Sequence, residues 1–321
     1  MGLFWVTGDS LITLRELPDE CVDLIVTSPP YLRKVGYLAD DDPNKKLELG
    51  IEERPVDFIE NLLELSDEWF RILRDTGSIC VDLGDTFSGS GGAGGDHNPG
   101  GMKPTERKYA GTAAAKRKFP DDWPGAKSLC MIPEAYRLGL AYGRNPLDSD
   151  ETGSHERWLI RNVLTLCQTH PKPGRQGDKF WPATTDIVVA CKSGHRYWQE
   201  DHPNPSLERS TARGDAGRAK DWWSYRNGGV KGHPASWPTE ILSPLIVSMS
   251  PPGGVVLDPF AGSGTTLMVA SNMGRTAIGV DLQNEYLEMA RADMVGPYLQ
   301  SVTAKELGAE LTAIKERVAK P

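Results

Sequence analysis

The chain has 321 residues, of which 39% are hydrophobic, and a formal net charge of -8 at pH 7. This composition is that of a globular protein with a core large enough for one large domain or two modest ones. No uninterrupted apolar run reaches the roughly 18 residues that a membrane span needs, and residues 1–6 lack the basic segment and cleavage site of a signal peptide. We therefore expect a cytoplasmic protein with no membrane partner.

Short apolar runs alternate with longer helical patterns along most of the chain, which predicts an α/β fold around a mainly parallel sheet. The predicted strands are the short apolar runs at residues 4–6, 22–26, 78–83, 158–166, 186–191, 255–258 and 276–281. The predicted helices follow the longer patterns at residues 10–17, from Pro55 to Leu73, near 133–142, at 238–250, at 265–273, from Asn284 onward and in the tail after Thr303.

Shifts in composition divide the chain further. Residues 86–127 are rich in Gly, Ser, Pro and charge, and a connection of this length is usually functional or disordered, so we expect a flexible loop. Residues 1–85 and 128–195 are expected to form one half of a domain and residues 233–300 the other half. Residues 196–232 are expected to form a separate recognition region, and residues 301–321 a terminal helix.

Metal chemistry has little support in the residue pattern. The five cysteines are widely spaced without a Cys-x-x-Cys pair, and the six histidines show no His-Glu-x-x-His spacing. We expect the cysteines to be reduced, buried thiols and the histidines to be packed or hydrogen-bonded residues, with no metal site.

A proline-rich segment, Thr27-Ser28-Pro29-Pro30-Tyr31, directly follows a predicted strand; we call residues 28–31 the proline turn. Open α/β sheets bind ligands at the carboxyl ends of their strands. The prolines lack backbone N–H donors, so the Ser28 hydroxyl and the Pro29 carbonyl can each accept a hydrogen from an exocyclic amino group, while Tyr31 can stack on its ring. Acceptors that draw these protons out of the ring plane localise the nitrogen lone pair, which predicts an activated amino nucleophile.

A second chemistry-bearing segment is the run from Asp258 to Thr266, in which residues 259–264 form what we call the glycine turn. Its glycines let the backbone approach a ligand closely, but the run lacks the Gly-Lys-Ser/Thr of a triphosphate-binding loop, and Leu267 replaces the third glycine of a dinucleotide fingerprint. Asp258 would repel a pyrophosphate and tolerate the cationic groups of S-adenosylmethionine, and Asp281, which ends the next strand, can accept hydrogen bonds from ribose hydroxyls. The candidate cofactor-binding residues are Asp258, Pro259, Phe260, Ala261, Gly262, Ser263, Gly264, Thr265, Thr266 and Asp281.

Two basic stretches, residues 101–120 and 205–231, stand out against the acidic average. Cations interleaved with aromatic rings suit a groove for an opened nucleic-acid strand. The candidate DNA-binding residues are Lys116, Arg117, Lys118, Arg213, Arg218, Trp222 and Trp223.

Together these motifs resemble the β-class DNA amino-methyltransferases of the cytosine-N4 type, in which the catalytic motif precedes the cofactor motif. The resemblance is clear over residues 4–85 and 230–292. It implies a Rossmann-like methyltransferase fold with a circularly permuted, mainly parallel seven-stranded sheet and a small target-recognition region. It also implies S-adenosyl-L-methionine as cofactor, a flipped cytosine in double-stranded DNA as substrate, a cognate restriction endonuclease as partner, and a monomer or homodimer. The same resemblance assigns cofactor contacts to Asp9, Thr27, His233, Ser236 and Trp237.

Several alternatives stay open at this point. Ser28 is typical of the cytosine-N4 branch, whereas the adenine-N6 branch usually carries Asp or Asn at that position, so an adenine-N6 enzyme is the nearest alternative. A non-catalytic DNA-binding relative is another. A C5-cytosine methyltransferase is excluded because it needs a thiolate from a Pro-Cys turn, and no cysteine of this chain follows a proline.

Overall fold

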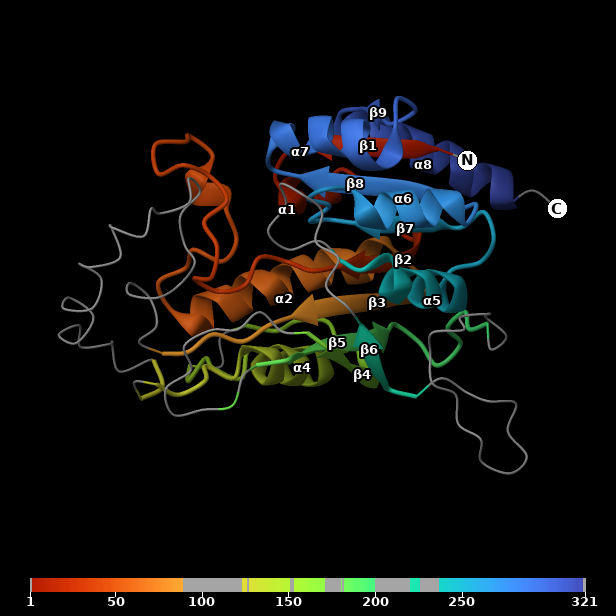
Figure 1. The fold of residues 1–321 in the computed structure, drawn as a ribbon. Coiled ribbons are helices and arrows are strands. Elements are labelled where there is room, and N and C mark those ends of the chain that lie inside the picture. Colours follow the sequence, from red (N-terminus) through yellow and green to blue (C-terminus); the bar gives the residue numbers. More distant parts are fainter. Residues whose placement is uncertain are drawn as a thin grey trace. The chain divides into compact units, whose positions relative to one another are not determined.

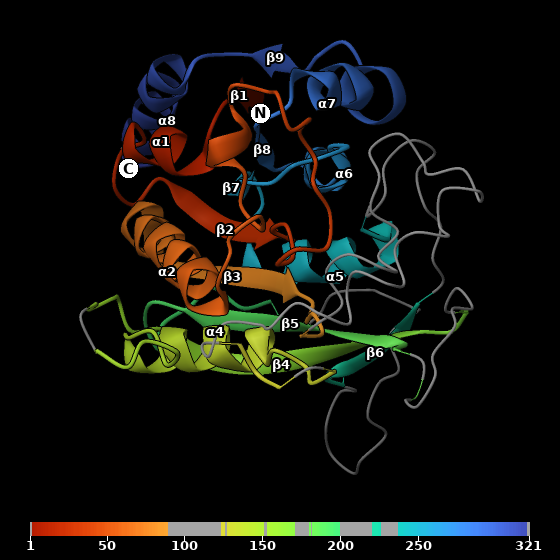
Figure 2. The same cartoon turned by 90° about the vertical axis from the view of Figure 1, so that its left-hand side faces the viewer.

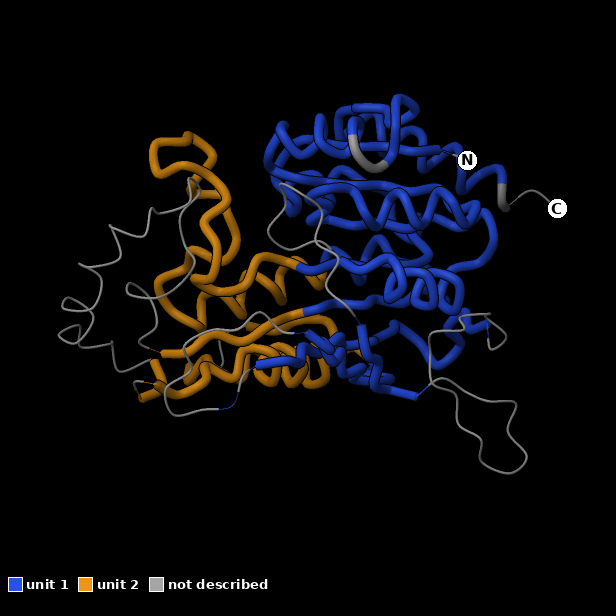
Figure 3. Tube along the Cα trace, viewed as in Figure 1, with its two compact units in different colours: residues 1–28, 68–82, 159–321 blue, residues 29–67, 83–158 orange. Residues whose placement is uncertain are grey.

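The computed structural model describes residues 2–88, 123–125, 127–150, 153–170, 180, 182–199, 220–225 and 237–319 (Figure 1). Most of the predicted loop at 86–127 therefore lies outside the described residues. The chain divides into two compact units, coloured separately in Figure 3. Unit 1 comprises Met1–Ser28, Glu68–Asp82 and Leu159–Pro321, and unit 2 comprises Pro29–Asp67 and Leu83–Trp158. This division follows spatial contacts, whereas the division made from the sequence followed composition.

Among the described residues, unit 1 is built on a sheet of nine strands in the order β6-β4-β5-β3-β2-β7-β8-β1-β9. The strands are β1 Leu3–Thr7, β2 Val22–Thr27, β3 Leu73–Leu83, β4 Leu159–Gln168, β5 Thr184–Cys191, β6 Trp222–Tyr225, β7 Val255–Asp258, β8 Thr276–Asp281 and β9 Gln300–Ser301. The pairs β1–β8, β1–β9, β2–β3, β2–β7, β4–β6 and β7–β8 are parallel, and β4–β5 is antiparallel.

The α/β class and the mainly parallel sheet are thus confirmed, and all the predicted strands are present. Within the part of the chain that the structure describes, the sheet has nine strands where seven were expected, because the short β6 and β9 lie at its two ends. Leu73 is the first residue of β3 and not the last of a helical face. The apolar pattern runs without a break from the preceding helix into this buried strand, so periodicity alone misplaces the boundary.

Helices cover both faces of this sheet. In Figure 2, α1 and α8 lie against one face, and α5, α6 and α7 lie against the other. The helices among the described residues are α1 Ser10–Arg15, α2 Pro55–Ile72, α4 Ile132–Tyr142, α5 Thr239–Met249, α6 Thr265–Asn272, α7 Asn284–Met289 and α8 Ala304–Ala319, with a 3-10 turn at Lys45–Leu47 and a π-helical turn at Ala290–Val295. None of the described helices is long and apolar enough to cross a membrane.

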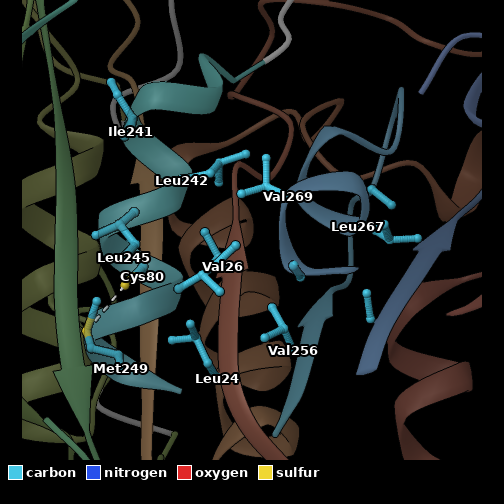
Figure 4. Packing of buried hydrophobic residues seen from close by; sticks show 14 of the residues in the cluster. Leu24, Val26, Cys80, Ile241, Leu242, Leu245, Met249, Val256, Leu267 and Val269 are labelled. Carbon is cyan, nitrogen blue, oxygen red and sulfur yellow. Dashed lines mark hydrogen bonds between the residues drawn. The ribbon is translucent and has the colours of Figure 1, made fainter. Parts of the chain in front are cut away.

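The core of unit 1 lies between α5, α6 and the sheet. Figure 4 shows Leu242 of α5 on the side of the helix that faces Val26 of β2 and Val269 of α6, and Leu245 on the other side of the helix; all four residues are buried. At the far end of α5, the Cys80 thiol lies 3.8 Å from the sulfur of Met249. Truncation of one such buried leucine to alanine typically lowers the free energy of unfolding by about 2–5 kcal/mol, so this layer holds the central strands together.

The pairing of β2 with β7 joins the two halves of the chain. Leu24 lies opposite Val256 and Ile25 opposite Leu257, so two strands that are more than two hundred residues apart in sequence are neighbours in the sheet. The start of the pair is held by Asp23, whose carboxylate accepts the backbone N–H of Val255 at 2.7 Å. Because the strands are parallel, the proline turn and the glycine turn begin at the same edge of the sheet.

Unit 2 packs α4 against the first turns of α2. The Ser66 and Tyr136 hydroxyls lie 2.7 Å apart, and a Cβ built on Gly139 would lie 2.9 Å from both Leu63 methyl carbons, so the helices meet closely. The buried His155 ring lies between two carboxylates, with Nδ1 2.7 Å from Asp67. This histidine confirms the expectation of hydrogen-bonded histidines.

The five cysteines of the chain are all thiols without a disulfide partner. Cys21, Cys80, Cys130 and Cys191 are buried as expected, but Cys167 is only half-buried because it lies near the sheet edge. Burial raises the pKa of the Cys21 thiol to about 12. No group of three or more His, Cys, Asp or Glu side chains among the described residues could hold a metal ion.

The close packing beneath the glycine turn gives a stability prediction. A Cβ on Gly279 of β8 would lie 2.9 Å from Ala261 Cβ and from a Leu267 methyl, whereas a Cβ on Gly194 would meet nothing within 4 Å. Gly279→Ala should therefore lower the free energy of unfolding by about 1–3 kcal/mol through overpacking, and Gly194→Ala should leave it unchanged. Urea unfolding measures both; equal stabilities of the two variants would contradict the packing described here.

Candidate functional site

Four neighbouring parallel strands of unit 1, in the order β2-β7-β8-β1, end at one edge of the sheet. Their last residues are Thr27, Asp258, Asp281 and Thr7. The segments predicted to carry chemistry follow these residues directly, which places the start of the proline turn, the glycine turn and Asp9 along the same edge. Ligands of open α/β sheets bind at such an edge.

The glycine turn depends on left-handed backbone. Gly262 has φ +50° and Gly264 φ +79°, and a Cβ on Gly264 would lie 2.9 Å from the Cβ of Ala290. Any other L-residue at position 264 would meet both backbone strain and a clash. Across residues 258–266, only the Phe260 side chain is half-exposed and the others are buried. The turn therefore offers a ligand its backbone and the Phe260 ring.

Asp258 lies under this turn as a structural acceptor. One carboxylate oxygen accepts the Thr27 hydroxyl at 2.8 Å and the Phe260 N–H at 3.1 Å, and the other accepts the Thr266 hydroxyl at 2.6 Å. The side chain is buried, and burial raises the pKa of its carboxyl to about 6. Direct contact with a cationic ligand was expected here; the carboxylate instead faces three donors of the protein itself.

Asp281 supports the turn from the neighbouring strand and stays half-buried. Its oxygens accept the backbone N–H groups of Gly262 at 2.9 Å and Gln283 at 3.0 Å. An ionised carboxylate has about four acceptor positions, so two more donors, such as ribose hydroxyls, can still be accommodated. Burial raises the pKa of this carboxyl to about 6 as well.

The segment after β1 is bound to the glycine turn. Asp9 caps α1 by accepting the Ile12 N–H at 2.8 Å, and the Gly8 N–H donates to the Asp281 carbonyl at 2.9 Å. The buried Ser10 hydroxyl donates to the Pro259 carbonyl, 249 positions away in sequence. The sequence motif Gly8-Asp9-Ser10 had indicated a cofactor contact at Asp9, whereas the contact that Ser10 makes with the glycine turn was not foreseen.

Thr27, the last residue of β2, and Ser28, the first residue of the proline turn, belong to unit 1. Thr27 is fully buried, and its hydroxyl donates a hydrogen bond to the Asp258 carboxylate. Ser28 is half-exposed, and its hydroxyl has no hydrogen-bond partner within the described part of the chain. The two adjacent hydroxyls thus differ: one is internal to the fold, and the other is available to a ligand.

The remainder of the proline turn belongs to unit 2. The Tyr31 ring lies against Gly84, where an added Cβ would come within 2.8 Å of Tyr31 Cδ2, and the Lys34 ammonium lies 5.4 Å from the ring centroid. Gly50 has φ +92°, and a Cβ built on it would lie 3.0 Å from the carbonyl oxygen of Tyr31. The absence of side chains at two glycines therefore leaves room for the Tyr31 ring and its backbone.

The other predicted site residues divide into two sets. Those outside the described residues are Lys116, Arg117, Lys118, Arg213, Arg218, His233 and Ser236. Trp222 is 39% exposed and lies 5.2 Å from the Lys220 ammonium, whereas Trp223 is 8% exposed and donates its indole N–H to the Lys220 carbonyl. The predicted DNA contact of Trp223 is corrected, because side chains alternate along β6 and this one points into the core.

Trp237 packs half-buried against the core, and its buried indole N–H has no partner among the described residues.

These features define an α/β protein of the Rossmann-like methyltransferase type, with a glycine turn and an acidic residue at the ends of adjacent strands. The chain belongs to the N6/N4 DNA methylase family, whose model matches residues 22–292. Among relatives, the type II methyltransferase M.HpaI of Haemophilus parainfluenzae is 42% identical over 300 residues, which cover 89% of this chain and 72% of M.HpaI. The chain is thus a DNA methyltransferase of the N4/N6 class.

Solved structures share the fold. The cytosine-N4-specific PvuII DNA methyltransferase matches with a TM-score of 0.61 at 16% identity, covering 99% of this chain and 93% of that one. A putative DNA modification methylase of Thermus thermophilus, TTHA0409, solved with S-adenosyl-L-methionine, matches with a TM-score of 0.57 at 21% identity, covering 94% and 99%. The expected fold class is confirmed.

The buried carboxyl of Asp258 makes stability depend on pH. The pKa of this carboxyl is raised from 3.8 to about 6 in the folded protein. The stability that its protonated form contributes to the folded state is therefore fully present below pH 4 and is lost as pH rises through about 6. The parent should therefore lose stability relative to Asp258→Asn over this window, by about 3 kcal/mol at most. Urea unfolding of both proteins at pH 4, 5, 6 and 7 measures the difference. A difference that stays constant, or that grows in favour of the parent with pH, would contradict the assignment.

Proposed function

We propose that this protein transfers a methyl group from S-adenosylmethionine to the N4 amino group of a cytosine flipped out of duplex DNA. The observation that carries the proposal is the Ser28 hydroxyl: it is half-exposed and without a partner among the described residues, and it directly follows Thr27, which is bonded to the residue that precedes the glycine turn. An amino-group acceptor and a nucleoside-binding turn thus start side by side at one sheet edge.

The residues present fit a bound S-adenosylmethionine. The glycine turn offers backbone approach, the Phe260 ring is half-exposed, and Asp281 keeps acceptor capacity for ribose hydroxyls. The buried indole N–H of Trp237 is a donor without a partner among the described residues, as expected for a group that a ligand satisfies. When bound, this cofactor supplies an electrophilic methyl group on a sulfonium.

Asp9, His233 and Ser236 remain proposed cofactor contacts by resemblance. Asp258 and Thr27 are proposed to support the turn without touching the cofactor.

The proline turn is proposed to activate the amino group. The Ser28 hydroxyl and the Pro29 carbonyl each accept one proton of the exocyclic amine, which concentrates its lone pair on nitrogen. The nitrogen then forms a bond to the methyl carbon as the carbon–sulfur bond breaks, the electron pair remains on sulfur, and the nitrogen releases a proton to solvent. Neither proline has an N–H that would compete for the lone pair. Tyr31 is proposed to stack on the flipped ring.

The choice of cytosine rests on Ser28. A neutral hydroxyl at the head of the turn is typical of the cytosine-N4 branch, and the fold of the cytosine-N4-specific PvuII enzyme is shared. The type II relatives support a role beside a cognate restriction endonuclease. DNA contacts are proposed for Lys116, Arg117, Lys118, Arg213 and Arg218, and for the exposed Trp222. Adenine N6 is the second candidate, because the family includes both targets.

The methylated base identifies the reaction. DNA from cells that express the chain should contain N4-methylcytosine, measured by mass spectrometry of digested nucleosides, and cells with the empty vector should not. Detection of N6-methyladenine alone would assign the enzyme to the adenine branch. Neither base, from a protein that still binds S-adenosylmethionine, would indicate RNA or protein as substrate.

Removal of the Ser28 hydroxyl tests its proposed role. Ser28→Ala should lower the rate of methyl transfer at saturating substrates by about 100-fold, since loss of one aimed polar group at a reacting centre has effects of that order. Affinity for S-adenosylmethionine, measured by calorimetry, should change little. Ser243→Ala is the control, because Ser243 bonds within its own helix to the Thr239 carbonyl. A Ser28→Ala protein as fast as this control would refute the acceptor role.

A further inference from the structure

We propose that Thr27 is a positioning residue: its hydroxyl, through Asp258, ties the proline turn to the glycine turn. This inference rests on the proposed function, since it concerns how the acceptor Ser28 is held relative to the methyl donor. It replaces the expectation that Thr27 contacts the cofactor, because the Thr27 side chain is fully buried and cannot reach a ligand.

The contacts form a short chain of bonds. The Thr27 hydroxyl donates to one oxygen of Asp258 at 2.8 Å, although the two residues are 231 positions apart. The other oxygen accepts the hydroxyl of Thr266, in the first turn of α6, at 2.6 Å. The carboxylate thus connects the end of β2 with the first turn of the helix that follows the glycine turn.

The position of Thr27 makes this connection relevant to Ser28. Thr27 is the last residue of β2, lies opposite Val81 of β3, and is joined by one peptide bond to Ser28. A reacting atom misplaced by about 1 Å can slow an enzyme by about 100-fold. A hydrogen bond at the last fixed residue before Ser28 is therefore placed to control the direction in which the Ser28 hydroxyl leaves the sheet.

Valine suits a test, because it keeps the shape of threonine and removes only the donor. Without the Thr27 hydroxyl, Asp258 still accepts the Phe260 N–H and the Thr266 hydroxyl, so the glycine turn keeps its own support. Loss of the hydrogen bond between Thr27 and Asp258, which we call the tether, should therefore slow methyl transfer and leave cofactor binding intact. A purely structural hydroxyl would change both through stability alone.

A matched control lies on β8. Thr276 is buried like Thr27, at 4% exposure, but stands at the start of its strand, where its hydroxyl accepts the Gly2 N–H at 3.4 Å. Thr276→Val therefore removes a buried hydroxyl at the sheet edge opposite the site. Thr27→Ser retains the donor and serves as the conservative variant.

The experiment compares Thr27→Val, Thr27→Ser and Thr276→Val with the parent. Methyl transfer to DNA at saturating substrates should fall about 10- to 100-fold in Thr27→Val, with the Kd of S-adenosylmethionine changed by less than about threefold, and Thr27→Ser should recover most of the rate. The acid limb of the kcat–pH profile should move to higher pH in Thr27→Val only, because the Thr27 hydroxyl lowers the pKa of Asp258 and its loss removes that effect.

Each other result overturns the inference. Thr27 would be only a packing residue if Thr27→Val kept the parent's rate and the parent's acid limb. The same conclusion would follow if Thr27→Ser were as slow as Thr27→Val, or if Thr276→Val lost as much activity as Thr27→Val. These outcomes differ from failure of the proposed function, which would show as a parent protein whose product on DNA is not N4-methylcytosine. If that product is N6-methyladenine, the same four proteins still test the tether.

Discussion

The buried carboxylate of Asp258 is the constraint on which the site depends. A charged or polar group out of water is stable only if its hydrogen bonds are satisfied, and here the donors come from the end of β2, from the glycine turn and from α6. Segments separated by more than two hundred residues in sequence are thereby bound to one side chain. Burial raises the pKa of this carboxyl, and because the carboxylate is out of water it depends on these three protein donors for its hydrogen bonds.

The order of segments along the chain follows from this arrangement. The proline turn comes first and the glycine turn last, yet β2 and β7 are parallel neighbours, so both turns leave the same sheet edge. The buried side of α5 that carries Leu242 faces Val26, as Figure 4 shows, and stabilises that pair. Asp281 and Ser10 then attach the glycine turn to β8 and to the segment after β1. Catalysis and cofactor binding are proposed to use backbone that the sheet has already positioned.

Much of this could be predicted from sequence, and the failures have physical causes. Apolar runs followed by Pro or Gly mark the strands that end at Thr27 and Asp258. The pairing of these strands, with Ile25 opposite Leu257, follows from the folded sheet and not from either run alone. Patterns of apolar runs and turn residues do not predict the direction in which an individual side chain points. Asp258 and Asp281 look alike in sequence, but one is buried beneath three protein donors and the other keeps free acceptor positions. Likewise Trp222 and Trp223 differ only in which face of β6 they occupy.

Amide hydrogen exchange, followed by mass spectrometry with and without S-adenosylmethionine, tests most directly the claim that the two turns form one connected unit. If Asp258 joins them, cofactor binding will slow exchange in the peptide covering residues 22–28 as well as in the peptide covering residues 255–266. Protection confined to residues 255–266, with exchange at the end of β2 unchanged, would contradict the account.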